Sequence, residues 1–418
     1  MPECQMKKPS LLIVFLTVLI DLIGFGMVFP LLPILAENLN VNGFTIGALI
    51  AVYSVMQFVF APIWGRLSDR IGRRPILLVS TAGAAISYVI FAFGSGMTGM
   101  PGLIVLFASR VFAGICGANI TVAQAYIADI SLPEERSKRM GLIGMAFGLG
   151  FILGPFLSGI GLKQFGITGP GWIAASLCAA NFLFAFARLP ESWKPATESA
   201  PQRPHLDQFL HTIKMPKLGL LVLLFFIGTF IFSAFETTLG LLVSQNFNLK
   251  IHDVRGVFVF DSKIVYLYAY CAFIGALVQG GFIGRLVKRH GEPAVIAVSF
   301  LLVAVSIGPM PWMTPEQFGW TGLLLLLAVL SIGSSLARPP IFGMISILSP
   351  ATEQGTTIGV AQSAGSLARI AGPIFAATLF DASPAMPYVI CGVVSLITGL
   401  AAWKKLRENA TVQVTGIN

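Results

Sequence analysis

The sequence predicts an all-α integral membrane protein, with twelve transmembrane helices in two pseudo-symmetric six-helix bundles. Of its 418 residues, 56% are hydrophobic and 11% are charged, and the mean hydropathy is +0.84. A soluble domain of this size would not tolerate those values. The apolar runs are continuous over about twenty residues, as transmembrane helices require, whereas barrel strands would be short and alternating. The two halves of the chain also repeat each other.

Twelve apolar runs define the expected spans. They begin near Pro9, Thr45, Pro75, Gly102, Met140, Gly171, Leu218, Asp261, Pro293, Thr321, Thr356 and Pro384. The first run continues past Leu31 without a small-residue cleavage site, so we expect a retained span rather than a signal peptide.

The basic residues indicate the orientation. The net charge is +9, and most Lys and Arg fall in segments that we expect to be cytoplasmic, including Lys7, Lys8, Lys404, Lys405 and Arg407. This is the positive-inside pattern, so no nucleic acid is needed to explain the charge. We expect a multi-pass protein of the plasma (inner) membrane with both termini in the cytoplasm.

We expect an N-terminal bundle over 1–189, a cytoplasmic linker over 190–217, and a C-terminal bundle with a short cytoplasmic tail over 218–418. The linker is rich in proline and charge. In its later part Leu206, Phe209, Leu210 and Ile213 stand at helical spacing. They form either a short amphipathic helix on the membrane surface or a solvated tether.

An internal repeat relates the halves. Gly284-Arg285-Leu286 lies 219 residues after Gly65-Arg66-Leu67, and Gly372-Pro373 lies 218 residues after Gly154-Pro155. Two registers that agree within one residue indicate a duplication, with parallel bundles around an axis along the membrane normal. Lys288 stands where the first copy has Asp69, so a switch that depends on that carboxylate should be stronger in the first half.

The stretch from Gly65 to Arg74 holds four arginines between two apolar runs, and we expect a tight cytoplasmic turn there. It resembles the loop signature of the major facilitator superfamily, G-x-L-x-D-R-x-G-R-R/K, through Gly65, Leu67, Asp69, Arg70, Gly72, Arg73 and Arg74. The resemblance implies the major facilitator fold and transport by alternating access. As a hypothesis, Asp69 docks on the start of the eleventh span while Arg70 and Arg73 meet Asp129. These contacts would latch the bundles in the outward-facing state.

Two stripes of small residues mark the fifth span. Gly141, Gly144, Gly148, Pro155 and Gly159 form one stripe, and Gly150, Gly154 and Gly161 form the other. Such a helix can pack closely against two neighbours, and Pro155 permits a bend. Gly150-x-x-x-Gly154-Pro155 resembles the motif of proton-coupled antiporters in the superfamily, with Ser158 where a glycine is expected. The alternative is that these glycines serve packing alone.

Ionisable residues inside spans are candidates for proton and substrate coupling, because charge in a membrane is costly. Arg110 in the fourth span shares a face with Gly114, Gly117 and Gln124, and Arg110-x-x-x-Gly114-x-x-Gly117-Ala118 resembles the fourth-span motif of the superfamily, whose arginine is implicated in proton coupling. The alternative is that Arg110 reaches to the interface.

Asp21 in the first span and Glu236 in the seventh are the candidate proton carriers, since a carboxyl group in low dielectric is protonated more readily than in water. Arg369 in the eleventh span shares a face with Gln362 and is the expected counter-charge. A structural ion pair that never titrates is the alternative. Arg338 stands toward the cytoplasmic end of its span, so we expect it to snorkel.

Nothing in the sequence supports enzyme catalysis, nucleotide binding, a metal site or a cofactor, and a proton gradient is the expected energy source. The first half resembles the tetracycline-efflux branch of the drug:proton antiporters through Asp21-x-x-Gly24-x-Gly26, Gln57-Phe58-x-x-Ala61-Pro62 and Ala125-Tyr126-Ile127-Ala128-Asp129. Where that branch has a third-span aspartate, this chain has Ser87.

The resemblance implies a monomeric, proton-coupled efflux antiporter for small amphiphilic compounds other than tetracycline. A proton symporter or an exporter of a metabolite, and a membrane receptor with a transporter fold, are the alternatives.

Overall fold

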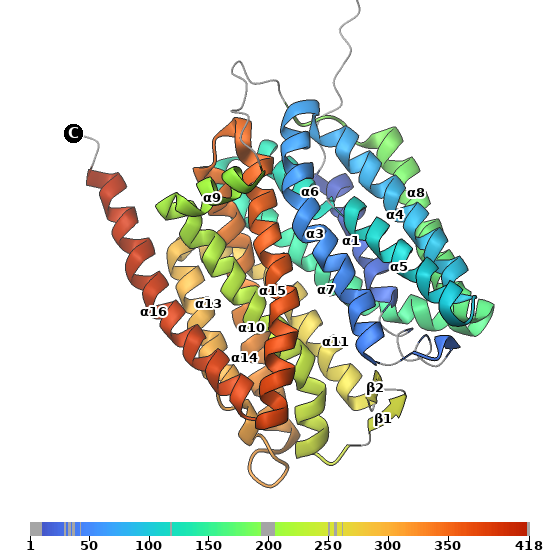
Figure 1. Ribbon diagram of the computed structural model, residues 1–418. Helices are drawn as coiled ribbons and strands as arrows, with labels where there is room; N and C mark the ends of the chain where they lie inside the picture. The colour runs from blue at the N-terminus through green and yellow to red at the C-terminus, as the bar shows by residue number, and fades with distance from the viewer. Residues whose placement is uncertain are drawn as a thin grey trace, which may run out of the picture.

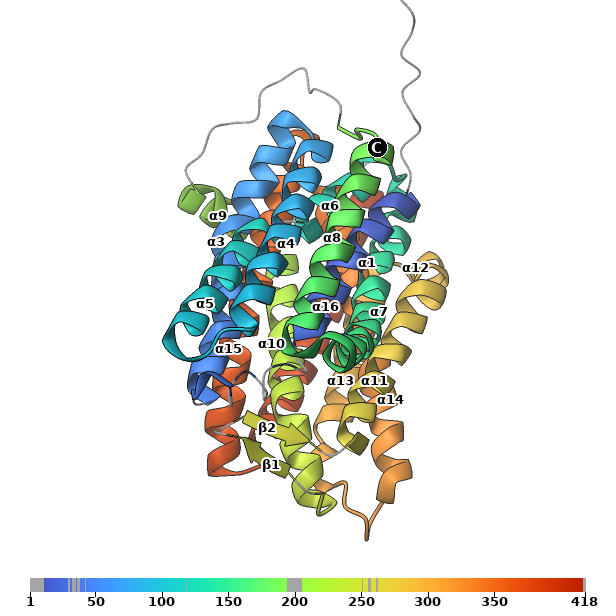
Figure 2. The same ribbon diagram turned by 90° about the vertical axis from the view of Figure 1, so that its right-hand side faces the viewer.

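The structure is a computed structural model that describes residues 11–28, 31, 35, 38–41, 43–117, 119–193, 205–249, 251–254, 257–260 and 262–415. Long helices cross the molecule side by side (Figures 1 and 2). Among these described residues, eleven stretches are long and apolar enough to span a membrane, and one of them, Pro133–Arg188, contains two long helices. The predicted fold class is therefore confirmed.

The first half contains α1 (Leu11–Val28), α3 (Gly43–Ile71), α4 (Arg73–Ser95), α5 (Gly99–Cys116), α6 (Asn119–Asp129), α7 (Pro133–Phe165) and α8 (Gly169–Arg188). The second contains α10 (Pro216–Asn246), α11 (Ser262–Leu277), α12 (Ile283–His290), α13 (Glu292–Ile307), α14 (Gly319–Leu348), α15 (Gln354–Ala382) and α16 (Met386–Thr415). Most helices begin within three residues of the predicted start. The exception is α7, which begins at Pro133 rather than near Met140, because its polar first turns precede the apolar run.

A short helix, α9 (His205–Lys214), lies between the halves. The sequence left a helix and a tether open for this segment, and the structure has the helix. Leu210 and Ile213 are exposed on it, at 50% and 41%. The prolines Pro195, Pro201 and Pro204 lie outside the described residues.

Two spans are interrupted. The fourth consists of α5 and α6, with Gly117 at the break. In the eighth, a π-helical segment, Val278–Phe282, separates α11 from α12. Such a segment adds a residue to the turn and re-aims the side chains on it, and Gln279 stands there.

A two-stranded hairpin was not predicted. Strand β1 (Ile251–Val254) pairs antiparallel with β2 (Val257–Phe260), with Ile251 opposite Phe260. It precedes α11, at the lower end of the molecule in both ribbon views (Figure 2). We call the other end, where α3 meets α4 and α12 meets α13, the basic end.

The predicted tight turn over Gly65–Arg74 is wrong for most of its length. Helix α3 continues through Ile71 and α4 begins at Arg73, so Gly72 alone interrupts the helical path. Its φ of 101° lies in a region that favours glycine, and a Cβ there would also meet the Glu191 carboxylate at 2.5 Å. The break is sharp because one residue makes it.

The two glycine stripes of α7 face two neighbours, as predicted. A Cβ on Gly148 would lie 2.7 Å from the carbonyl oxygen of Ala272 on α11, in the second half. A Cβ on Gly154 would lie 2.7 Å from the backbone of Gly26 on α1, in the first half. Two glycines depart from the pattern. Nothing lies within 4 Å of the Cβ position of Gly159, and that of Gly161 lies 2.8 Å from the backbone nitrogen of Pro170 on α8 rather than against α1.

This packing generates a test of how the halves close. Gly148→Ala should disfavour contact between α7 and α11, since overpacking costs about 1 to 3 kcal/mol, a shift of about tenfold in the balance of states. We expect pulsed paramagnetic resonance to show a longer distance between spin labels on the exposed residues Glu134 and Lys288. Gly159→Ala is the matched control and should leave the distance unchanged, so equal distances in both variants would contradict the packing argument.

Candidate functional site

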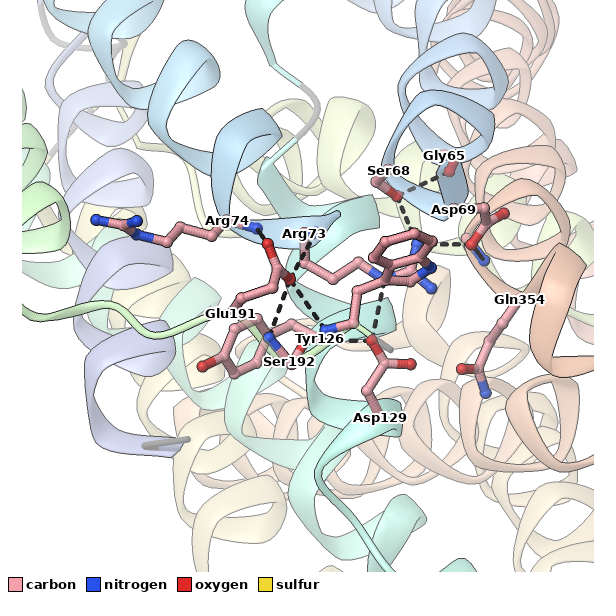
Figure 3. Close-up of polar contacts among 12 residues, drawn as sticks. Gly65, Ser68, Asp69, Arg73, Arg74, Tyr126, Asp129, Glu191, Ser192 and Gln354 are labelled. Atoms are coloured by element: carbon pink, nitrogen blue, oxygen red, sulfur yellow. Dashed lines mark hydrogen bonds and ion pairs between the residues drawn. The ribbon is translucent and has the colours of Figure 1, made fainter. Parts of the chain in front are cut away.

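The Asp69 carboxylate joins the two halves at the basic end (Figure 3). Its Oδ1 accepts from the backbone N–H of Gly355 at 2.8 Å, and its Oδ2 accepts from the N–H and hydroxyl of Thr356 at 2.7 and 2.8 Å. The first N–H groups of a helix lack partners within that helix, and its dipole favours an anion there. The predicted contact between Asp69 and the start of the eleventh span is present.

Arg73 supports Asp69 from the side of the first half. Its Nη1 lies 2.6 Å from Oδ1 of Asp69, and its Nε lies 3.0 Å from Oδ2 of Asp129. The Arg73 side chain is 0% exposed, and a buried cation requires charged partners of this kind. The contact predicted between Arg73 and Asp129 is therefore present.

Arg70 does not join this cluster. It is exposed, and within the described part of the chain it forms no ion pair with Asp129. Because α3 is still helical at this point, Arg70 is rotated by about 100° from Asp69. The predicted Arg70–Asp129 contact is wrong for that reason.

Glu191 is a member of the cluster that the sequence did not indicate. Its carboxylate accepts from the backbone N–H groups of Arg73 and Arg74, at 2.9 and 3.1 Å, where α4 begins. It also accepts from the N–H groups of Ser192 and Trp193. Glu191 thus fixes the segment that follows α8 to the start of α4 (Figure 3). No spacing in the sequence links it to a helix more than a hundred residues earlier.

The contact between the halves is different at the second copy of the basic stretch, Gly284–Gly291. Next to that copy, Ser137 of α7 donates to Oε1 of Glu292 at 3.1 Å. Nη1 of Arg136, also on α7, donates to the carbonyl oxygen of Ser346 at 2.8 Å. These bonds also join the halves, but they hold no buried ion pair like that of Asp69 and Arg73. The difference follows from Lys288, which replaces the carboxylate.

Polar side chains continue the contact between the halves toward the middle of the spans. Gln362 on α15 donates to Gln124 on α6 at 2.8 Å. Arg369 donates to Oε1 of Gln57 on α3 at 3.2 Å and to Ser366 at 2.9 Å. The candidates Gln124 and Gln362 therefore meet directly, and Arg369 reaches the first half through Gln57.

The two interior acids lie apart, one in each half. Asp21 on α1 accepts a weak hydrogen bond from the Cys178 thiol of α8, with a sulfur–oxygen distance of 3.9 Å. Glu236 lies on α10, one helical turn after Ser233, which packs against Gly372 of α15, one turn after Arg369. Neither acid is within 4.0 Å of a basic group in the described residues, where the ion pairs are Arg73–Asp69, Arg73–Asp129 and Arg139–Glu135. The alternative of a structural ion pair does not hold in this state.

Arg110 turns toward protein rather than toward the interface. It is 3% exposed, and its Cζ lies 4.7 Å from the ring centre of Phe91 and 5.6 Å from that of Tyr88. The structure places it in contact with these two rings of α4 and not with Asp21 or Glu236.

The prediction that Arg338 snorkels to the membrane surface is wrong. Its Cζ lies 4.6 Å from the ring centre of Phe147 on α7 and 5.6 Å from that of Phe225 on α10. The face of α14 that carries it, rather than its height in the span, decides its surroundings.

One family model covers most of the chain. The model of the Major Facilitator Superfamily matches residues 14–281 and 260–416. This chain belongs to the Major Facilitator Superfamily. It is thus a multi-pass membrane transporter, and the motif at Gly65–Arg74 is the loop signature of that superfamily.

Relatives place the chain near drug-resistance members of the superfamily. It is 32% identical to the class D tetracycline resistance protein of Salmonella ordonez, over 90% of each chain. It is 25% identical to multidrug resistance protein 2 of Bacillus subtilis, over 97% of each. A crystal structure described as the human organic anion transporter MFSD10 matches with a TM-score of 0.78 and 26% identity, covering 94% of this chain and 98% of that one.

The Asp69 contact predicts the effect of one substitution. In Asp69→Asn the amide nitrogen would face a backbone N–H that needs an acceptor, and hydrogen bonds to charged groups contribute about 1.5 to 3 kcal/mol each. We expect the basic end to open about tenfold more often, measured as faster maleimide alkylation of a cysteine introduced at Ser363, which is 1% exposed between the halves.

The control for this substitution is Glu135→Gln. It removes the ion pair with Arg139, which lies within one half and is partly exposed, and such pairs contribute about 0 to 1 kcal/mol. Equal alkylation rates in Asp69→Asn and the parent protein would show that Asp69 does not hold the halves together.

Proposed function

We propose that this transporter exports small amphiphilic compounds in exchange for protons, by alternating access. It would act as a monomer in the plasma (inner) membrane, with both termini in the cytoplasm, and use the proton gradient rather than a cofactor or a catalysed reaction. The tetracycline and multidrug resistance proteins among its relatives support export of drug-like compounds. The loss of the third-span aspartate, with Ser87 in its place, supports a compound other than tetracycline.

The observation that carries the proton part is the pair of interior acids. Asp21 and Glu236 lie within spans and are only partly exposed, and neither forms an ion pair in the part of the chain that the structure describes. A carboxylate without a cation in low dielectric gains by taking up a proton. Each acid is thus suited to alternate between a charged and a neutral form during transport.

The surroundings of Asp21 hold hydrogen-bonding groups for both of its forms. Asn181 on α8 lies within hydrogen-bonding reach of Asp21, and its Nδ2 donates to the carbonyl oxygen of Thr17 at 3.0 Å. Its Oδ1 is buried without a donor. A protonated Asp21 would supply that donor, whereas an ionised one accepts hydrogen bonds from Cys178 and Asn181.

The closed basic end supports alternating access. Hydrogen bonds join the halves from Asp69 at that end to Arg369 in the middle of the spans. A cytoplasmic basic end closed in this way belongs to a stage in which the site communicates with the outside. Release of Asp69 from α15 would begin the opposite stage.

The proposal predicts the behaviour of everted vesicles. With an acid interior, the unmutated protein should accumulate members of a panel of lipophilic cations, organic anions and neutral drugs, and a protonophore should abolish the accumulation. The double variant Asp21→Asn, Glu236→Gln should lose this accumulation but retain counterflow, because the neutral side chains mimic the protonated forms. Asp207→Asn, an exposed acid on α9, should behave like the parent.

Accumulation that persists in the double variant would reject both acids as proton carriers. A proton symporter would instead move its substrate out of the acid vesicles. An absence of counterflow for every compound would favour the receptor alternative.

A further inference from the structure

Arg338 lies between the two halves of the molecule, among aromatic side chains. Its guanidinium carbon lies 4.6 Å from the ring centre of Phe147 on α7, which belongs to the first half. Phe225 on α10 and Phe342 on α14 lie 5.6 and 5.9 Å away, both in the second half. The rings of Phe225 and Phe342 pack edge to face at 4.8 Å. Arg338 therefore stands in an aromatic environment built from three helices.

The ring contacts leave two nitrogens of Arg338 without hydrogen bonds. Its Nε and Nη2 are buried and have no partner in the described residues. An aromatic ring attracts a cation through the face of the ring, but it does not satisfy the N–H donors, which lie in the guanidinium plane. Unsatisfied donors on a buried cation are costly, so this arrangement favours a ligand that accepts hydrogen bonds and carries negative charge.

Arg369 adds a second cation nearby. Phe225, whose ring lies beside Arg338, also packs against Gly365, one helical turn before Arg369. The hydrogen-bond partners of Arg369 are the neutral side chains of Gln57 and Ser366. Counting the interior arginines Arg110, Arg338 and Arg369 against Asp21 and Glu236, the formal charge is +3 − 2 = +1 with both acids ionised. The excess is positive, and Arg338 and Arg369 both lie on the second half, on α14 and α15.

We propose that Arg338 and Arg369 bind an anionic group of the transported compound, a carboxylate or sulfonate, and that Phe147 and Phe225 pack against its aromatic or apolar part. Guanidinium groups bind such anions through paired N–H donors in one plane. This inference rests on the proposed transport function and narrows its substrates from amphiphilic compounds in general to amphiphilic anions.

The location explains how such an anion would affect the states of the transporter. Arg338 contacts Phe147, and Arg369 contacts Gln57, so both cations of the second half touch the first half. An anion bound between them changes the charge at surfaces that separate when the halves rock. Its binding therefore differs between the two states, which is what a transported substrate requires.

The test compares ligands of one shape and three charges. The probes are 2-naphthylacetate, its neutral amide, and 2-naphthylethylamine, measured by calorimetry on the full-length protein in detergent. We expect the carboxylate to bind at least about tenfold more tightly than the amide, because a charge-assisted hydrogen bond contributes about that much. Equal binding of the three, tightest binding of the amine, or no binding of the carboxylate up to its solubility limit would each overturn the proposal.

Variants then assign the effect to Arg338. Arg338→Gln should weaken binding of the carboxylate about tenfold and leave binding of the amide unchanged, whereas Arg338→Lys should keep part of the preference for the anion. Arg188→Gln is the matched control, because Arg188 is an exposed arginine at the end of α8. An unchanged affinity for the carboxylate in Arg338→Gln would remove Arg338 from the site. If that variant does not fold, the comparison of ligands on the unmutated protein still decides.

The binding test is independent of the proton gradient. Loss of gradient-driven accumulation with a retained preference for the carboxylate would reject proton exchange and keep the anion site. Gradient-driven accumulation of cations or neutral drugs, together with equal binding of carboxylate and amide, would support proton exchange and reject the anion site.

Discussion

The carboxylate of Asp69 at the start of α15 is the interaction on which the observed state depends. Its three hydrogen bonds, from Gly355 and Thr356, place a charged group directly at the contact between the halves. The contact requires close backbones, and Gly65 and Gly355 provide them, since a Cβ on Gly65 would clash with the carbonyl group of Gly355.

Arg73 stabilises the cluster in a different way. It holds Asp69 and Asp129 within the first half, so the charges remain paired when α15 moves away. Separation of the halves then exposes one helix start rather than an isolated buried cation.

The sequence predicted most of the fold and part of the cluster, for separate reasons. The spans follow from apolar runs that no other structure tolerates. The contacts of Asp69 and Arg73 were predicted through the resemblance to the loop signature of the superfamily, which includes both residues. The stripes of α7 follow from helical periodicity, which also explains the error at Gly159, because periodicity gives the face of a residue but not whether a neighbour reaches it.

Two of the failures have one cause in common. Glu191 and Arg338 depend on which helix lies beside them, and one sequence contains no record of that. Arg70 was misplaced for another reason, because α3 stays helical through Ile71 where a turn was expected. For Arg338, height in the span suggested an interfacial position, but its neighbours are Phe147 and Phe225 from other helices. Gly72 shows the same limit, because the carboxylate that occupies the space beside it comes from Glu191, after α8.

The proposed anion site and the proposed proton carriers constrain each other. Glu236 and Arg369 lie on α10 and α15, which pack against each other near these residues, so a proton on Glu236 would remove a negative charge near Arg369 and strengthen anion binding. Linkage makes this mutual, and a proton and an anion that strengthen each other travel together. Exchange in opposite directions needs the reverse relation, in which one ligand favours the state that releases the other.

Asp21 is better placed than Glu236 for exchange in opposite directions. It lies in the first half beside Cys178 and Asn181, where its proton adds no charge next to Arg338 or Arg369 but completes the hydrogen bonds of Asn181. On this reasoning Asp21 couples to the anion only through the rocking of the halves, which is the form of coupling that permits exchange. Of the two proposed carriers, Glu236 would also set how strongly Arg369 attracts its ligand.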